Sequence, residues 1–517
     1  MYKKFILMKQ ASLFLFTVQL LAILFFCSKH LSALVVSGVV YEDINKNSVF
    51  DKKDKAIPNI GVSNGIDIVL TDKKGTYQLD LKGSDYVFII KPDKFDCILD
   101  KTTKIPQFFS FFDVDTLKKE KINNVNFALT RGKKKKDLSV VFLGDIQVRN
   151  DEQLAYFRNA FMPDLIKEQA DLYITLGDNV YNNLNLYPSL LKTLGNVDTH
   201  IYYTAGNHDI TTIANGPDLQ YLTFKRYIGP TYFSFNYSNV HFVILESVKW
   251  DGYRYYGAFG KRQLDWLKND LAFVDKDKLV FFIMHIPIVR WNGSNQFIDA
   301  VNDKDEFLSI VKGFKNSLIV AGHTHTIEKI YDKDYLQHNG KPLEMSILIA
   351  GAVSGDRWRG EVNEYGIPYA RMKDGSPKGY YLITIKDNIF KETYKMPGRS
   401  TSEQMGIYLV DNSTLISNST VLFNESDNIH LVVNVFNGDT YSKVLYSLND
   451  RNYVTMERNF LADPLFYNIS DSDKPYRSFH IWSTHLSGLE KGINNIKVKY
   501  IDKNDNVFEE ITLFEVK

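Results

Sequence analysis

Hydrophobic and polar residues alternate differently in three successive parts of the chain. Across residues 34–130, short segments alternate with a period of two and are separated by turn residues, which is typical of half-buried β-strands. Across residues 137–396, apolar strand-like segments take turns with amphipathic segments of helical spacing, such as 151–170 and 261–273. From residue 400 to 517 the period of two returns. The pattern therefore predicts three folded regions.

The middle region is predicted to be a layered α/β domain, because its strands and helices alternate along the chain. Some of its segments instead read as antiparallel strands, at 231–237, 241–246, 344–350 and 379–386. Two sheets are therefore expected in this region. The predicted fold is a mixed α/β domain, an αββα sandwich, flanked by two all-β, sandwich-like domains.

The first 33 residues carry the pattern of an export signal. Three lysines within the first nine residues precede an uncharged apolar run at 11–27, which is the layout of a secretory signal peptide. Three outcomes stay open: cleavage after Ala33, lipid attachment at Cys27, or retention of the apolar run as a membrane anchor. Each predicts an exported protein in the periplasm, at the outer membrane or on the cell surface.

Charge and cysteine content narrow the expected partners. The 62 Lys and Arg residues and the 61 Asp and Glu residues give a formal net charge of +1, so no global positive charge attracts nucleic acid. No specific nucleic-acid binding is therefore expected. The two cysteines are Cys27 and Cys97, and removal of Cys27 leaves no intramolecular disulfide. The oligomeric state is not predicted from the sequence.

An oxygen-rich loop follows the first predicted strand. Its oxygen-bearing side chains are Asp43, Asn45, Asn47, Asp51 and Asp54. Their spacing matches the calcium loop of an EF-hand, although Ser48 replaces the glycine of the sharp turn and Asp54 replaces the bidentate glutamate. The segment predicts either a calcium site or an Asn/Asp-rich turn that caps itself. In both cases the module is structural.

Five segments of the middle region place metal-binding side chains directly after apolar strands. These segments are Gly144–Gln147, Gly177–Asn179, Gly206–Asp209, His285 and Gly322–His325. Parallel strands that end at one edge of a sheet would bring them together, where α/β domains build their sites. Glycine before the ligand lets the backbone turn tightly. Each segment alone is weak evidence, but all five in this order indicate a metal site.

These segments resemble the motifs of the calcineurin-like metallophosphoesterases, which are DxH, GDxx, GNH followed by an acid, a lone H, and GHxH. The resemblance covers residues 138–395. The segments WRGE at 358–361, KDGSPKGY at 373–380 and HIWSTHLSGLEKGINNIKVKYID at 480–502 resemble an exported bacterial subgroup with an N-terminal β-module and a C-terminal β-domain. The resemblance implies a metal-dependent hydrolase of a phosphate mono- or diester.

The resemblance also implies a centre of two divalent metal ions. Such a pair, of Mn, Fe, Zn or Co, clamps a phosphoryl group and activates a bridging hydroxide. Asp178 is implied as the ligand shared by both ions. The remaining ligands are implied to be Asp145, Gln147 and His325 for one ion, and Asn207, His285 and His323 for the other. His208 is implied as general acid or charge stabiliser, with Asp209 orienting it.

The chain departs from the family pattern at Gln147, where the motif has histidine. An amide oxygen can still coordinate, so we expect a more weakly held first metal that favours Mn²⁺. One alternative is a non-catalytic binding or surface protein with a degenerate metallophosphoesterase core. Another is a calcium-stabilised surface adhesin with an incidental enzyme-like core. Four further residues are expected either to line the substrate side or to anchor a loop to the core: Asp356, Arg357, Trp358 and Asp374.

Overall fold

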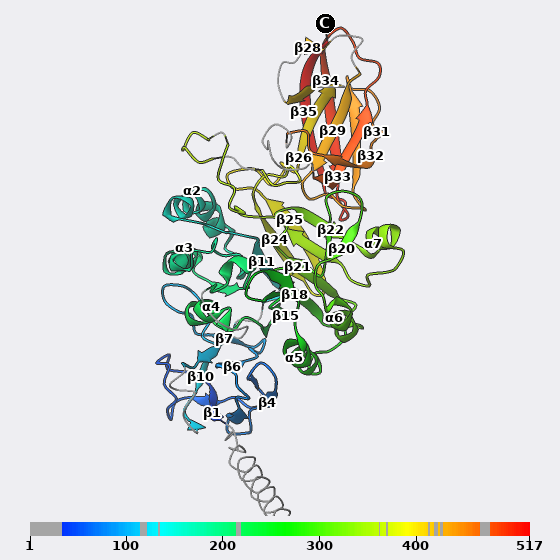
Figure 1. The fold of residues 1–517 in the computed structure, drawn as a ribbon. Coiled ribbons are helices and arrows are strands. Elements are labelled where there is room, and N and C mark those ends of the chain that lie inside the picture. Colours follow the sequence, from blue (N-terminus) through cyan, green and yellow to red (C-terminus); the bar gives the residue numbers. More distant parts are fainter. Residues whose placement is uncertain are drawn as a thin grey trace, which may run out of the picture.

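The computed structural model describes residues 34–113, 121–132, 135–212, 219–360, 362–368, 371–411, 414–417, 422–423, 428–465 and 476–516. The predicted export signal, with Cys27 and Ala33, lies outside these residues. Within them, no helix is long and apolar enough to cross a membrane. Figure 1 shows a β-rich N-terminal region, a central region of strands and helices, and a β-rich C-terminal region at the opposite end. This arrangement confirms the predicted fold class.

The N-terminal module consists of two β-sheets. One has the order β2-β1-β10-β7, with β5 and β9 also paired to β1, and the other has the order β4-β3-β6-β8. The strand β5 shows why the sequence forms this module, since Tyr77 and Leu79 are buried while Thr76 and Gln78 face outward. The strands are β1 (Val35–Glu42), β2 (Lys55–Ala56), β3 (Gly61–Ser63), β4 (Ile68–Leu70), β5 (Thr76–Asp80), β6 (Tyr86–Ile89), β7 (Phe95–Cys97), β8 (Phe109–Phe111), β9 (Lys121–Ile122) and β10 (Phe127–Arg131).

The central domain contains two sheets that face each other, and Phe142 of one stacks on Phe281 of the other. The first sheet, in order, is β13 (His200–Tyr203), β12 (Leu172–Thr175), β11 (Asp137–Leu143), β24 (Tyr380–Lys386) and β25 (Ile389–Lys395). The second, in order, is β14 (Phe233–Tyr237), β15 (Val240–Leu245), β18 (Leu279–Met284), β21 (Ser317–Ala321), β23 (Ile347–Ala350) and β22 (Ile327–Ile330). Both sheets mix parallel and antiparallel pairs.

Helices cover both outer faces of the paired sheets, as an αββα sandwich requires (Figure 1). One group comprises α2 (Asp151–Glu168), α3 (Tyr187–Leu194) and α4 (Leu222–Tyr227), and the other comprises α5 (Lys261–Leu271), α6 (Lys304–Val311) and α7 (Asp332–Asn339). Short 3₁₀ turns are η2 (Leu184–Leu186), η3 (Gly195–Val197) and η4 (Asn207–Asp209). Two hairpins complete the domain: β16 (Val248–Trp250) with β17 (Tyr255–Gly257), and β19 (Val289–Trp291) with β20 (Phe297–Asp299).

Helix α2 shows how local sequence sets these elements. The side chain of its N-cap residue Asn150 accepts a hydrogen bond from the N–H of Gln153. Phe157 and Phe161 lie one turn apart on its buried face and stack on each other. The helix ends at Glu168, two residues before the predicted end, because Gln169 adopts a left-handed conformation.

The register of the parallel strands brings their carboxyl ends to one edge. In the first sheet, the pairs Leu143–Thr175 and Thr175–Tyr203 align the ends of β11, β12 and β13. In the second sheet, the pairs Leu245–Met284 and Met284–Ala321 align the ends of β15, β18 and β21. All five predicted ligand segments follow one of these six strands. The topology therefore positions a site at this edge.

The C-terminal domain packs two five-stranded sheets around an apolar core that includes Leu431, Val433, Ile496 and Val498. One sheet, in order, is β27 (Thr414–Ser417), β26 (Met405–Asp411), β29 (His430–Val435), β33 (Arg477–His485) and β32 (Glu457–Ala462). The other, in order, is β28 (Leu422–Phe423), β35 (Val507–Val516), β34 (Gly492–Ile501), β30 (Lys443–Leu448) and β31 (Val454–Thr455).

The C-terminal domain docks on the central domain through buried aromatic and polar contacts. The ring of Trp291 stacks on Phe460, with ring centroids 5.3 Å apart. The indole N–H of Trp291 donates to the carbonyl of Arg477 at 2.7 Å. Trp291 is almost completely buried, so the two domains share part of their core.

Candidate metal centre

The strand-end turns of both sheets converge, and contacts link all seven predicted ligands. His325 Nε2 lies 3.2 Å from Asp145 Oδ1, and His285 Nε2 lies 3.3 Å from Asp178 Oδ1. The other contacts are Gln147 Nε2 to Asp178 Oδ2 at 3.3 Å, Asn207 Oδ1 to His285 Nε2 at 3.0 Å and His323 Nδ1 to His285 Nε2 at 3.2 Å. The backbone N–H of His323 donates to Oδ2 of Asp145 at 2.8 Å and joins these contacts into one continuous cluster of segments far apart in the sequence.

Two groups within this cluster have the geometry of a metal site, and both include Asp178. The first combines Asp178 with His285 and His323, and the second combines it with Asp145 and His325. Within each group the ligand atoms lie within 4.8 Å of one another. A carboxylate with two oxygen atoms can bridge two cations, which is the arrangement of two-metal hydrolytic sites.

Two oxygen atoms in this cluster are buried and lack a hydrogen-bond donor. They are Oδ1 of Asp145 and Oε1 of Gln147. His325 lies close to the first, but its position does not meet the geometry of a hydrogen bond. A buried acceptor without a donor is costly and uncommon, whereas a cation would satisfy it. This observation fits the donor set to a metal ion and includes Gln147 in that set.

Five of the seven predicted ligands hold their backbone in the left-handed region. The φ angles are 36° at Asp145, 46° at Gln147, 46° at Asp178, 74° at His323 and 55° at His325. Each such conformation costs about 1–3 kcal/mol in a residue other than glycine, and such residues cluster at functional sites. The turns therefore aim their side chains inward at the expense of backbone strain.

The motif glycines let the strand ends approach one another closely. A Cβ atom on Gly177 would lie 2.5 Å from Nδ1 of His285, and a Cβ atom on Gly322 would lie 2.5 Å from Oδ2 of Asp145. Any side chain at these positions would collide with a predicted ligand. The glycines thus serve the packing of the ligands as well as the tight turn.

The buried carboxylates and histidines of the cluster shift one another's pKa values. Burial alone would raise the pKa of Asp178, but His285 and His208 outweigh it and hold that pKa below its usual range. Burial lowers the pKa of His285, yet the charge and hydrogen bond of Asp178 reverse this effect and raise it to about 9. Burial and the charge of His285 hold the pKa of His323 well below its usual value.

His208 lies beside the cluster and its ring is fixed from two sides. The ring stacks on Tyr181 with centroids 4.3 Å apart. Its Nδ1 atom lies 2.9 Å from Oδ1 of Asn182, so Nδ1–H is the donor and Nε2 is left to face the cluster. Nε2 lies 4.0 Å from Oδ2 of Asp178. Burial lowers the pKa of His208, with Asp178 acting in the opposite direction.

Asp209 was expected to orient His208, but in the structure Asn182 makes that contact. Asp209 is fully buried and accepts hydrogen bonds from the N–H and amide groups of Asn179 and from the hydroxyl of Tyr187 at 2.8 Å. Consecutive residues of a 3₁₀ turn point in different directions, so sequence neighbours do not share a partner. Burial and a neighbouring aspartate raise the pKa of Asp209 to about 6. It holds the turn rather than the imidazole.

The loop that carries Asp356 and Trp358 begins beside the metal cluster, where the N–H groups of Ser354 and Gly355 donate to the carbonyl of Asp145. Asp356 forms an ion pair with Arg149. The ring of Trp358 packs against Tyr156 and Phe161 of α2, with centroids 5.5 and 6.4 Å apart. These contacts favour the loop–core anchor over the substrate-lining alternative for Trp358.

Asp374 lies at the interface with the C-terminal domain. It is fully buried, accepts the N–H of Ile327 at 2.6 Å and lies 3.2 Å from Nε2 of His480. These contacts favour the anchoring role for Asp374, and the substrate-lining role stays a prediction. Arg357 is half-buried and donates its backbone N–H to the carbonyl of Ser354.

The oxygen side chains of loop 43–54 bind donors of the loop itself. Asp43 accepts the N–H groups of Asn47 and Ser48, and Asp51 accepts the amides of Asn45 and Asn47. Asp54 accepts the N–H groups of Ile44 and Asp51. The loop thus forms the self-capping turn of the sequence expectation, and these contacts do not test calcium binding.

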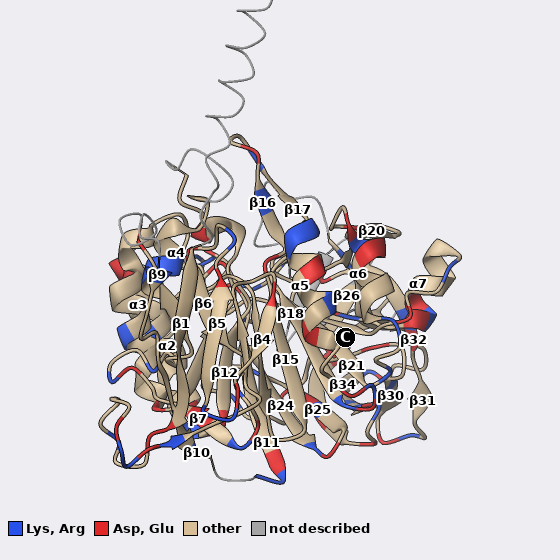
Figure 2. Cartoon of the chain, turned by 90° about the horizontal axis from the view of Figure 1, so that it is seen from below, with Lys and Arg blue, Asp and Glu red and all other residues tan. Residues whose placement is uncertain are grey.

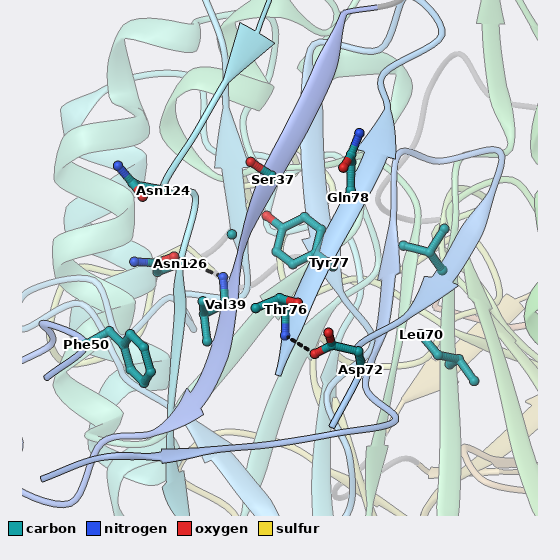
Figure 3. Close-up of a pocket in the computed structure, with 12 residues that line it drawn as sticks. Ser37, Val39, Phe50, Leu70, Asp72, Thr76, Tyr77, Gln78, Asn124 and Asn126 are labelled. Carbon is teal, nitrogen blue, oxygen red and sulfur yellow. Dashed lines mark hydrogen bonds between the residues drawn. The ribbon is translucent and has the colours of Figure 1, made fainter. Parts of the chain in front are cut away.

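A hollow of about 570 Å³ lies over β1 and β5 of the N-terminal module. Figure 3 shows Ser37, Gln78 and Asn126 around it. Its one aspartate, Asp72, accepts the N–H of Thr76 at 2.9 Å. The lining provides no group placed for catalysis.

Sequence reasoning missed three residues at the metal centre. Asn182 and Tyr181 fix His208, as described above. Tyr255 packs edge-on against His323, with ring centroids 5.7 Å apart. Tyr255 could have been noticed in the sequence, because the segment 253–256 reads Tyr-Arg-Tyr-Tyr between turn residues.

Three family models match consecutive parts of the chain. The model for the N terminal of calcineurin-like phosphoesterase matches residues 44–132, the model for calcineurin-like phosphoesterase matches residues 138–326, and the model for the C terminal of calcineurin-like phosphoesterase matches residues 348–508. No curated protein matches the sequence.

Solved structures with some similarity include three phosphatases. PhoD shares 12% identity over 78% of this chain and 90% of its own, with a TM-score of 0.38. A dimetal phosphatase from Danio rerio shares 13% identity over 50% of this chain and 99% of its own, with a TM-score of 0.32. A purple acid phosphatase from yellow lupin (Lupinus luteus) seeds shares 12% identity over 68% of each chain, with a TM-score of 0.37. TM-scores this low carry no argument, so the comparison depends on the family models.

Proposed function

Because this chain belongs to the calcineurin-like phosphoesterases, we propose that it hydrolyses a phosphate mono- or diester at a centre of two divalent metal ions. The members of this family are metal-dependent phosphoric ester hydrolases. The observation that carries this proposal is the position of Asp178, which belongs to both ligand groups. A single-metal site would have no need of a second group around the same carboxylate.

Asp178 would be shared by both ions, with Asp145 and His325 holding one ion and His285 and His323 the other. Asn207 would join the second set through its contact with His285, and the family motif places Gln147 in the first set. The donors are oxygen and nitrogen without sulfur, which suits Mn, Fe, Zn or Co. When bound, the ions supply Lewis-acid activation of the phosphoryl group and of the attacking water. Their charge exceeds that of the two carboxylates, which attracts an anionic substrate.

His208 is the group placed to serve the leaving oxygen. Nε2 faces the cluster while Nδ1–H donates to Asn182, so the proton-transfer atom is held toward the substrate. As imidazolium, His208 stabilises charge on the phosphoryl group and donates a proton to the departing alkoxide. Stacking on Tyr181 restricts the ring to this orientation. In this role Asn182 replaces the orienting function that the sequence suggested for Asp209.

Gln147 is a working ligand in this proposal. Its Oε1 atom is buried without a donor, as a ligand oxygen would be, and its amide nitrogen contacts Asp178. A decayed site would favour the alternative of a non-catalytic binding protein, but the other six ligand positions and His208 are all present. We therefore keep the enzyme as the proposed function.

We also propose that the protein is exported. This proposal is supported by the lysines and apolar run of the first 33 residues. Cell fractionation of the full chain tests it, with recovery in the cytoplasm alone as the contrary result.

The activity is tested with the purified protein loaded with Mn²⁺ or Zn²⁺. Hydrolysis of p-nitrophenyl phosphate and of bis(p-nitrophenyl) phosphate distinguishes a monoesterase from a diesterase. A chelator is expected to abolish turnover and added metal to restore it. The variant Asp178→Asn should be inactive, whereas Asp51→Asn, which changes a carboxylate outside the centre, should retain activity. Absence of chelator-sensitive turnover on both esters and on a broad phosphoester panel would remove the enzyme proposal.

A further inference from the structure

Strand β15 of the second sheet ends at the metal edge and is not followed by a predicted ligand. The end of β15 is aligned with the ends of β18 and β21, which carry His285 and His323. In place of a ligand, β15 continues into the hairpin of β16 and β17. Figure 2 shows this hairpin projecting beyond the neighbouring strands. The fold therefore adds an exposed structure directly at the edge where the metal cluster lies.

The base of the hairpin is fixed by buried polar contacts. Glu246 accepts from the amide of Gln220 at 3.0 Å and from Lys249 at 2.5 Å. The hydroxyl of Ser247 accepts the N–H of Ile286, the residue after His285, at 2.8 Å. These bonds tie the hairpin to the strand that carries a predicted ligand. Its position relative to the metal cluster is thus set by the core.

The hairpin residue Tyr255 contacts the metal cluster and is also exposed to solvent. Tyr255 packs edge-on against His323, yet 42% of its surface is exposed. Tyr256 is 40% exposed. Exposed aromatic rings beside a reactive centre offer flat apolar faces, and their hydroxyl groups offer hydrogen bonds.

A hollow of about 420 Å³ opens beside the hairpin, which is the size of an ordinary small-molecule pocket. Its lining consists of Asp251, Arg254, Tyr255, Tyr256 and Asn302. The backbone N–H of Asn302 donates to the carbonyl of Gly257 at 2.9 Å, so the hairpin and the loop at 302 hold each other. Among the described residues, the side chains of Tyr256 and Asn302 have no hydrogen-bond partner, which leaves them free to bind a ligand.

We propose that this hollow binds the leaving group of the phosphoester and that the leaving group is a sugar. The inference rests on the proposed phosphoesterase function. A sugar ring has an apolar face that stacks on tyrosine and hydroxyl groups that bond to amide and carboxylate side chains. Tyr255 places the stacking surface beside a metal ligand, where the leaving group must lie when its phosphate occupies the metal centre.

The charge of the lining argues against other leaving groups. Arg254 lies 3.4 Å from Asp251, so the two charges offset each other in the hollow. A polynucleotide would need a row of unpaired cations along its backbone. A quaternary ammonium group would be repelled by the guanidinium of Arg254, although tyrosines could otherwise enclose it. A neutral polar ring fits this balance.

The test compares glucose 1-phosphate with trifluoroethyl phosphate, a ring-free ester whose alcohol has similar acidity. For the wild type, kcat/KM should be about tenfold or more higher for the sugar ester. Tyr256→Ala and Asn302→Ala should each reduce the ratio of the two kcat/KM values about tenfold, which corresponds to the loss of one stacking or hydrogen-bonding contact. Tyr256→Phe keeps the ring and should keep most of the preference.

Tyr253→Ala is the matched control, because Tyr253 lies in the same hairpin, is 94% exposed and is not part of the lining. It should leave the ratio unchanged. The inference is overturned if the wild type shows no preference for the sugar, prefers a nucleoside monophosphate or choline phosphate, or if Tyr256→Ala and Asn302→Ala leave the ratio at its wild-type value. Absence of turnover on every ester would instead overturn the proposed function itself.

Discussion

At the strand ends of the central domain, Asp145 and Gln147 each keep one buried oxygen atom without a donor. In loop 43–54 of the N-terminal module, Asp43 and Asp51 accept hydrogen bonds from the loop itself. Both segments are rich in oxygen side chains, and the sequence suggests a metal for each. The difference lies in the donors. A turn that can satisfy its own carboxylates is stable without an ion, whereas a turn that cannot do so depends on a ligand.

The backbone differs between the two regions in a related way. At the candidate metal centre, five of the predicted ligands are themselves left-handed, including Asp178 with a φ of 46°. In the loop, the left-handed residues are Lys46 and Ser48, which lie between the oxygen-bearing positions. Backbone strain at a predicted ligand directs its side chain toward the cluster. Backbone strain at a residue between the oxygen-bearing positions only closes the turn.

The largest expected effect comes from the shared carboxylate. Asp178→Asn should lower kcat by about a thousandfold or more and reduce the metal content, because both ions lose a charged ligand. The equivalent change in the loop, Asp51→Asn, should leave kcat and metal content at wild-type values. Steady-state kinetics with elemental analysis of both variants checks the pair. Equal loss in the two variants would erase the distinction between the regions.

The next effect concerns a side chain that serves the centre without binding metal. His208→Ala should lower kcat by about a hundredfold, the usual contribution of a general acid, while metal content stays unchanged. The loss should be smaller for an ester with an acidic leaving group, such as p-nitrophenyl phosphate, because that group needs no proton. If the variant lost its metal as well, His208 would be a ligand rather than an acid.

In the loop, the expected effect is on stability alone. Asp43→Ala leaves the N–H of Ser48 without its acceptor and the N–H of Asn47 with Asn45 alone, which should cost about 1–3 kcal/mol of unfolding free energy. Denaturant unfolding measures this loss. Calcium and a calcium chelator should leave the melting temperature of the wild type unchanged. A calcium-dependent rise in that temperature would show that the loop is a metal site after all.

Gln147→His sharpens the comparison within the metal centre. Imidazole is a stronger ligand than an amide for Mn, Fe, Zn or Co, so the first metal should bind about tenfold more tightly. Activity should persist, since the other ligands are unchanged. Metal titration followed by competition with a chelator measures the affinity. An unchanged affinity would mean that Gln147 does not contact the ion.

The smallest effect concerns Glu510, whose carboxylate has one unsatisfied oxygen atom but does not belong to a predicted metal site. Oε1 of Glu510 in β35 is buried without a partner, and burial together with the charge of Glu403 raises its pKa to about 7. A raised carboxylate pKa means that the folded state binds the proton more tightly than the unfolded state. This residue therefore lowers stability as the pH rises from about 4.5 to 7.

Glu510→Gln should remove that loss. The variant should gain up to about 1 kcal/mol over the wild type at pH 8, after allowance for partial solvent exposure, and should gain nothing at pH 4. Thermal unfolding at the two pH values checks the difference. The same gain at both pH values would show that the carboxylate charge is not the cause.

The convergence of the seven predicted ligands could be expected from the sequence because each follows a strand within a few residues. The strand, the glycine and the ligand form one local signal, and parallel strand ends must meet. Asn182 and Tyr181 could not be assigned this way, since their roles arise from contacts with His208 in another turn. The sequence also does not show which way the side chains of neighbouring residues point. For this reason Asp209 was expected to make the contact with His208 that Asn182 makes.

The motifs outside the ligand set were less informative. Trp358 and Asp374 stand in segments that resemble a family pattern, but Trp358 packs on α2 and Asp374 bonds across the domain interface to His480. A sequence pattern indicates that a residue is important, but it does not show which residues that residue contacts. The fold class was predictable because it follows from the alternation of strands and helices, whereas these contacts between distant segments depend on the packed structure.

The central claim is that Asp178 joins two metal ions into one hydrolytic centre. The most direct measurement is the number of Mn²⁺ or Zn²⁺ ions bound per chain, determined together with phosphoester turnover before and after chelation. The account predicts about two ions per chain, with turnover that disappears on chelation and returns when metal is added. A chain that binds at most one ion, or that hydrolyses esters equally well after chelation, would contradict it.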